Sequence, residues 1–118
     1  IVVLEGISMY LTNLELKTLI SNIGNHFETV SLLMDCYSLF AAKMSKYKNP
    51  IKDVGVTQVF GIDNPELVVD SNVLFKKEHE MIPAKCIEEL DGLEKFIFRK
   101  LYAGNLSKKL YKLYEFEK

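Results

Sequence analysis

The chain has 118 residues, of which 48% are hydrophobic and 26% are charged, a composition that predicts one soluble globular domain rather than a disordered segment. Its formal net charge of −1 disfavours nucleic-acid binding, which usually needs a clearly basic domain. Two cysteines, Cys36 and Cys86, are too few for a disulfide framework and predict reduced thiols. No apolar run reaches the roughly 20 residues that a membrane span needs. We therefore expect a cytoplasmic protein without a membrane partner.

Two apolar strands are predicted in the early part of the chain. Residues 1–4 are continuously apolar and mostly β-branched, which is typical of a strand covered on both faces in a parallel sheet. Glu5 and Gly6 follow at its carboxyl end. Residues 30–35 repeat this arrangement, with Asp35 as the acidic residue. With a helix between them, the two strands form a βαβ unit.

The helix between these strands begins with a capping box, in which Thr12 is the N-cap and Glu15 lies three residues later. Apolar residues then recur at helical spacing and predict an amphipathic helix from residue 13 to about residue 23. Gly24 and Asn25 are plausible stop signals, so we expect the helix to end there.

The rest of the chain alternates helices, loops and strands. Ser38 is placed to cap a second helix that runs to about Tyr47 and ends at residues 49–50. Glycine, asparagine and proline punctuate residues 51–70, which predicts a functional loop region with one helical turn. The remaining elements that we expect are a strand over 73–82 with a solvated charged portion, a helical segment over 83–102 broken near Gly92, a turn at 104–105 and a last strand over 110–116.

Ligands of open α/β sheets bind outside the carboxyl ends of the strands, so the segments that follow the two apolar strands are candidate sites. Glu5 can accept hydrogen bonds from a ligand's amine or hydroxyls, or attract a cationic centre such as a sulfonium. Gly6 allows close backbone approach, although strand-end glycines more often serve ordinary turns. Tyr10 either presents its hydroxyl to a substrate or packs, with packing as the default. Asp35 either faces a ligand or caps the next helix, and the structural role is favoured.

Other signals for chemistry are weak. His26 and His79 lie apart, each among polar residues, which predicts neither a metal site nor a general base. The chain has no glycine-rich phosphate loop, GxSxG elbow or HExxH helix, which disfavours several hydrolase and nucleotide-binding functions. No catalytic residue is assigned, and no stand-alone cofactor site is evident.

Residues 4–11, LEGISMYL, resemble the EGxxMYL segment of the leucine carboxyl methyltransferase and polyketide O-methyltransferase-like family. Three later pieces agree in order and spacing, namely MDCYS at 34–38, FAA at 40–42 and FGID at 60–63. The resemblance covers about the first 70 residues well and the remainder loosely. Relatives often have tryptophan before the glycine, where this chain has Phe60. The resemblance therefore does not define the shape of the acceptor pocket.

The resemblance implies an α/β fold that is the C-terminal half of a Rossmann-like class I methyltransferase sheet, mostly parallel with an antiparallel last strand. Residues 1–118 would form one portion of a single domain, in which the two apolar strands are the fourth and fifth of seven. The glycine-rich cofactor loop and the ribose-binding acid would then lie upstream of this chain. The implied site residues are Glu5 and Gly6 for S-adenosylmethionine, and Met9, Tyr10 and Phe60 for the methyl acceptor.

The resemblance implies a fragment of an S-adenosylmethionine-dependent O-methyltransferase that acts on a carboxylate or hydroxyl of a small molecule or protein. The fragment alone is expected to be inactive, because half of the cofactor site would be missing. The first strand would lack a neighbour, and its apolar edge predicts a homodimer or aggregation. The competing hypothesis is a non-catalytic interaction or scaffold module, since a fold does not establish an activity.

Overall fold

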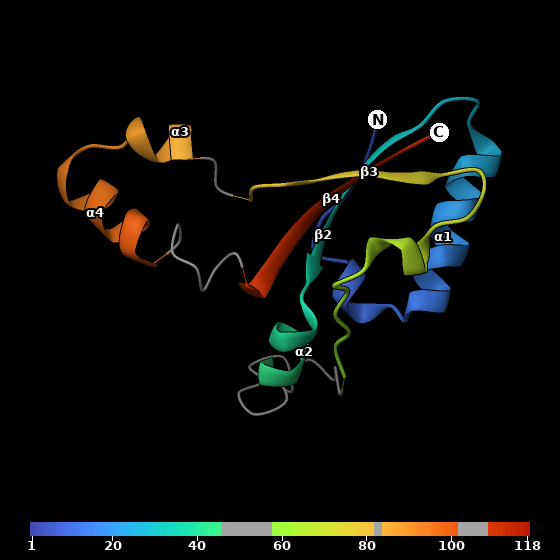
Figure 1. Cartoon of the computed structure of the whole chain (residues 1–118), viewed down its shortest axis with the longest axis horizontal. Helices are drawn as coiled ribbons and strands as arrows, with labels where there is room; N and C mark the ends of the chain where they lie inside the picture. The colour runs from blue at the N-terminus through green and yellow to red at the C-terminus, as the bar shows by residue number, and fades with distance from the viewer. Residues whose placement is uncertain (46–57, 82–83, 102–108) are drawn as a thin grey trace.

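A computed structural model describes residues 1–45, 58–81, 84–101 and 109–118 as a mixed α/β domain (Figure 1). The predicted turn at 104–105 and the predicted helix end at 49–50 lie outside the described residues. In chain order the elements are β1 (Val2–Leu4), the 3-10 helix η1 (Ser8–Tyr10), α1 (Asn13–His26), β2 (Ser31–Tyr37), α2 (Leu39–Ser45), the 3-10 helix η3 (Pro65–Val68), β3 (Leu74–His79), α3 (Ala84–Glu88), α4 (Gly92–Leu101) and β4 (Tyr111–Glu117).

The described strands form one sheet in the order β1-β2-β4-β3 (Figure 1). β1 pairs with β2 in parallel, with Val2 opposite Leu32, as expected when a helix crosses between two strands. β4 lies between β2 and β3 and is antiparallel to both, so that Tyr114 has Met34 on one side and Glu78 on the other. Three strands therefore run in one direction, and the last strand runs in the opposite direction.

Helix α1 begins where the capping box predicts. The Thr12 hydroxyl accepts a hydrogen bond from the Glu15 N–H at 3.3 Å, and the Glu15 carboxylate accepts one from the Thr12 N–H at 2.8 Å. The helix runs to His26, so the prediction that it stops at Gly24 is wrong. Gly24 is buried, and a Cβ there would lie 2.5 Å from Val73 Cγ2. This glycine allows close packing inside the helix rather than ending it.

The main core lies between α1 and one face of the sheet. Leu16 and Ile20 of α1 are fully buried and belong to the same cluster as Met34 of β2 and Tyr114 of β4. Burial alternates residue by residue along β2, as expected for a strand with one face in a core. The Tyr114 hydroxyl donates a hydrogen bond to the Ile62 carbonyl at 3.2 Å, which satisfies the polar atom of this buried side chain.

Strand β1 forms one edge of the sheet and is covered on one face only. Val2 and Leu4 pack against the core, whereas Val3 is 61% exposed and Ile1 is 97% exposed. The prediction that both faces of this strand are covered is therefore wrong for this chain. The physical reason is that α1 packs on the face that carries Val2 and Leu4, and the opposite face has no such cover at Val3.

The remaining elements follow the predicted order. Helix α2 begins after Ser38, whose hydroxyl accepts a hydrogen bond from the Ala41 N–H at 3.0 Å. β3 carries the predicted solvated portion. Residues 89–91 separate α3 from α4, and Gly92, with a φ of +50°, is the first residue of α4. Glu88 of α3 pairs with Lys95 of α4 at 2.8 Å. In Figure 1 these two helices lie beyond the end of β3, away from α1.

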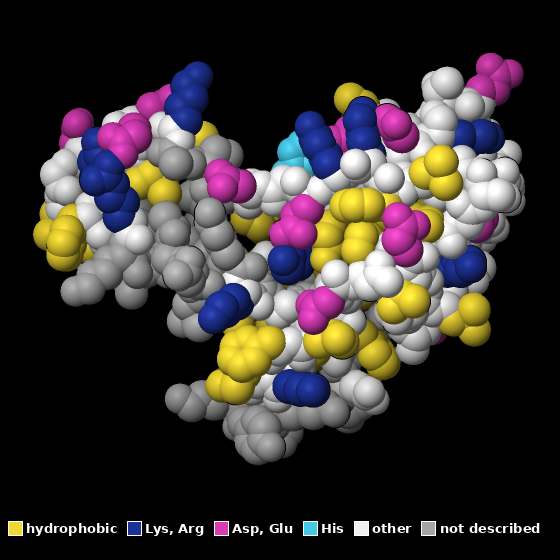
Figure 2. All heavy atoms as spheres, in the orientation of Figure 1, with side chains coloured by type: hydrophobic (Ala, Val, Ile, Leu, Met, Phe, Trp, Pro, Cys, Tyr) yellow, Lys and Arg dark blue, Asp and Glu magenta, His cyan; other side chains and the backbone are white. Residues whose placement is uncertain are grey.

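Hydrophobic side chains reach the surface around α2 and over the α3–α4 part of the molecule (Figure 2). Leu39 and Phe40 of α2 are about half exposed, and Leu93 of α4 is 75% exposed. None of the helices within the described ranges has both the length and the apolar character needed to cross a membrane. The surface around α2 borders the candidate site.

Candidate functional site

The turn after β1 contains an open backbone position. Gly6 has a φ of +67°, a conformation that residues with side chains rarely adopt. A Cβ at this position would meet nothing within 4 Å, so the space beside Gly6 is open. The Gly6 N–H donates to Asp35 Oδ1 at 2.8 Å, which ties the turn to the neighbouring strand β2. A ligand therefore has access to the backbone at Gly6.

Glu5 precedes this glycine at the carboxyl end of β1. Its side chain is exposed and makes no hydrogen bond or ion pair within the described part of the chain. A free carboxylate accepts hydrogen bonds from amine or hydroxyl groups of a ligand. The two residues predicted to contact a cofactor are thus both accessible.

Asp35 has a structural role, although it does not cap the next helix. Its carboxylate accepts the Gly6 N–H, and its carbonyl accepts a hydrogen bond from the Ser8 hydroxyl at 2.5 Å. The first turn of α2 is instead held in part by Asp63 Oδ1, which accepts from the Leu39 N–H at 3.0 Å. Asp35 therefore shapes the turn after β1, a role that its position near the end of a strand did not reveal.

Helix η1 connects this turn to a second part of the site. Met9 is 6% exposed and packs with Ala42 and Val59. Its carbonyl accepts a hydrogen bond from the Phe60 N–H at 2.8 Å. Tyr10, for which packing was the default interpretation, is 43% exposed. Met9 thus holds the segment that carries Phe60, whereas Tyr10 reaches solvent.

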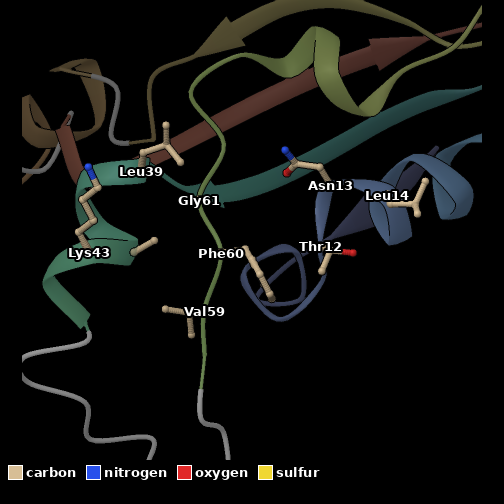
Figure 3. Close-up of a pocket in the computed structure, with 9 residues that line it drawn as sticks. Thr12, Asn13, Leu14, Leu39, Lys43, Val59, Phe60 and Gly61 are labelled. Carbon is tan, nitrogen blue, oxygen red and sulfur yellow. The ribbon is translucent and has the colours of Figure 1, made fainter.

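An open pocket of about 520 Å³ lies between the start of α1, helix α2 and residues 59–61 (Figure 3). Phe60 lies on the side toward the start of α1, and Leu39 and Lys43 of α2 lie across the pocket from it (Figure 3). Most of the lining is apolar, and Lys43 is the one charged side chain among the described residues that line it. The resemblance implied a role for Phe60, which lines this pocket, whereas Lys43 belongs to no motif and was not predicted.

Residues 60–62 are held tightly against the junction of β2 and α2. The Ile62 N–H donates to the Tyr37 carbonyl at 2.7 Å. A Cβ at Gly61 would lie 2.3 Å from the Ser38 carbonyl oxygen, so this position has room for glycine alone. The sequence interpretation treated Gly61 as loop punctuation, but its function is to allow this close backbone approach.

Two titratable side chains next to this region stay protonated at neutral pH. Burial, and then the Tyr111 hydroxyl, raise the pKa of Tyr37 to about 12. Burial raises the pKa of the Cys36 thiol to about 11, although a hydrogen bond with Ser8 opposes this shift. Because a nucleophilic cysteine reacts as the thiolate, Cys36 is not suited to covalent catalysis.

The two histidines lie in different surroundings. His26 is exposed and its ring packs edge-on against Phe27, with 4.7 Å between the centroids. His79 Nε2 lies 2.5 Å from Glu115 Oε2, and Lys76 pairs with the other oxygen of Glu115 at 3.1 Å. Within the described ranges, no three His, Cys, Asp or Glu side chains are grouped so that they could hold a metal ion.

The fold and the site define an α/β protein with a four-stranded mixed sheet, an accessible carboxylate and glycine at the end of β1, and an apolar pocket beside η1. No protein-family model, curated protein or solved structure matches the chain. The assignment of function therefore depends on the site itself.

Proposed function

We propose that this chain is the C-terminal part of an S-adenosylmethionine-dependent O-methyltransferase, in which Glu5 and Gly6 contact the cofactor. The observation that carries the proposal is the accessible Glu5–Gly6 turn at the carboxyl end of β1, the end of an open α/β sheet where ligands bind. The antiparallel insertion of β4 between β2 and β3 also supports it, because the family that LEGISMYL resembles has its last strand in this orientation.

The chemistry requires little from the protein beyond positioning. When bound, the cofactor supplies an activated methyl group. The bound cofactor would transfer this methyl group to an oxygen of the acceptor. The Glu5 carboxylate holds the cofactor, Gly6 lets it approach the backbone, and the pocket beside Phe60 holds the acceptor. Orientation of two reactants is a large source of rate acceleration, and no covalent link to the enzyme is needed.

The proposal includes a longer sheet that continues beyond β1. The resemblance implies that the glycine-rich cofactor loop and the ribose-binding acid belong to upstream sequence. The edge of β1 has no partner strand in the described part of the chain, and Val3 beside it is 61% exposed. We therefore propose that the 118 residues alone do not transfer methyl groups and that their free edge pairs with a second copy.

The test is calorimetric titration of S-adenosylmethionine into a longer chain that includes the region upstream of Ile1. Glu5→Gln should weaken binding by roughly 5- to 15-fold, because a charge-assisted hydrogen bond becomes a neutral one that is about 1–1.5 kcal/mol weaker. Glu28→Gln is the matched control, because Glu28 is also exposed and has no partner within the described ranges. Unchanged affinity in the Glu5 variant would count against its role.

A further inference from the structure

The pocket between α1 and α2 combines apolar walls with a single positive charge. Leu14, Val59 and Phe60 supply apolar side chains, and the volume of about 520 Å³ lies within the range typical of small-molecule sites. Lys43 supplies the only charge in this lining as far as the chain is described. Such a lining favours a ligand with an apolar body and one anionic group, since the polar groups of a pocket orient its ligand.

The Lys43 ammonium has no partner among the residues that the structure describes. Its side chain is exposed, and no hydrogen bond or ion pair involves it within the described ranges. Lysines on the sheet differ, because Lys76 pairs with Glu115 at 3.1 Å and Lys112 pairs with Glu78 at 2.9 Å. The charge beside the pocket is thus free to pair with an anion.

We propose that this pocket binds a small apolar or aromatic molecule that carries one carboxylate, with its apolar body against Phe60 and its carboxylate at Lys43. This inference names the substrate class of the proposed methyltransferase and rests on that function for the reaction that follows binding. The binding step itself depends only on residues that this chain contains. The site can therefore be tested without the cofactor.

The test compares 4-phenylbutanoate with 4-phenylbutan-1-ol, which share an apolar body and differ in charge. Titrations of the 118-residue chain, followed by amide chemical shifts, give both dissociation constants. The acid should bind about two to five times more tightly than the alcohol, the effect of a solvent-exposed ion pair, with shifts at Phe60 and Gly61. Lys43→Met should remove this preference, whereas Lys43→Arg should keep it. Lys17→Met, on α1 outside this pocket, is the matched control.

Equal affinities for the acid and the alcohol would overturn the proposal, as would a preference that survives in Lys43→Met. Shifts confined to residues far from Phe60 would also overturn it. The Arg variant retains the charge, so a loss of preference in that folded protein contradicts the assignment to Lys43. The ligand titration contains no S-adenosylmethionine, so a negative result there does not contradict the proposed methyl transfer. In the same way, a negative cofactor titration does not contradict the carboxylate site at Lys43.

Discussion

Replacement of Gly61 by alanine tests how closely the pocket wall is held against the start of α2. The added Cβ would lie 2.3 Å from the Ser38 carbonyl oxygen and 2.7 Å from the Leu39 nitrogen. Both atoms belong to the backbone, so rotation of a side chain cannot relieve the overlap. Either the segment around Gly61 or the beginning of α2 must move.

The cost follows from the overlap and from the bonds beside it. Overpacking of a closely packed position costs about 1–3 kcal/mol. Movement of the segment also disturbs the bond from the Phe60 N–H to the Met9 carbonyl at 2.8 Å and the bond from the Ile62 N–H to the Tyr37 carbonyl at 2.7 Å. Each such bond contributes about 1 kcal/mol. We expect Gly61→Ala to lower the free energy of unfolding by about 2–4 kcal/mol.

Urea unfolding followed by circular dichroism measures this loss. Gly6→Ala is the matched control, because a Cβ there meets nothing within 4 Å. In that variant only the strain of the positive φ of +67° lowers the stability. That conformation costs an alanine about 1 kcal/mol. A Gly61→Ala protein as stable as the parent, or destabilised no more than Gly6→Ala, would refute the close approach at Gly61.

Three further predictions follow from the turn, the charged face of the sheet and the free edge. Asp35→Asn should shift the Gly6 amide proton upfield and lower stability by about 1 kcal/mol, because a charge-assisted bond becomes a neutral one; an unmoved amide resonance argues against this contact. Hydrogen bonds, chiefly with His79, hold the pKa of the Glu115 carboxyl below the ordinary 4.5. The contribution of Glu115 to stability is therefore present above pH 4.5 and is lost as the pH falls through the lowered pKa. Glu115→Gln should therefore flatten the acid side of the stability profile in urea titrations, and a profile identical to the parent's contradicts this. Val3→Lys should abolish self-association in light scattering, whereas Leu14→Lys on α1 should not; a monomeric parent protein removes the basis of this prediction.

Sequence patterns predicted elements whose signals are local. The start of α1 was predictable because Thr12 and Glu15 meet within one helical turn. Its end was not, since Gly24 is required by contact with Val73, which is distant in sequence. The apolar run at residues 1–4 correctly predicted a strand but wrongly predicted cover on both of its faces, because burial depends on which helix packs over each face.

The candidate site was predictable only in part, for the same reason. Glu5 and Gly6 were predicted as cofactor contacts from their place after an apolar strand and from the resemblance, and the structure shows that both are accessible. Asp35 was recognised as structural, but its partner at Gly6 depends on the pairing of β1 with β2. Lys43 and Phe60 come from segments that only the tertiary structure brings to one pocket, and neither residue has a local pattern that indicates the other.

The most direct test of the account is calorimetric titration of S-adenosylhomocysteine into the 118-residue chain and into a longer chain that includes the upstream region. The proposed function predicts binding to the longer chain and none to the 118 residues alone, because Glu5 and Gly6 would form only one side of the cofactor site. Absence of binding to both proteins would contradict the methyltransferase proposal and would favour a non-catalytic scaffold instead.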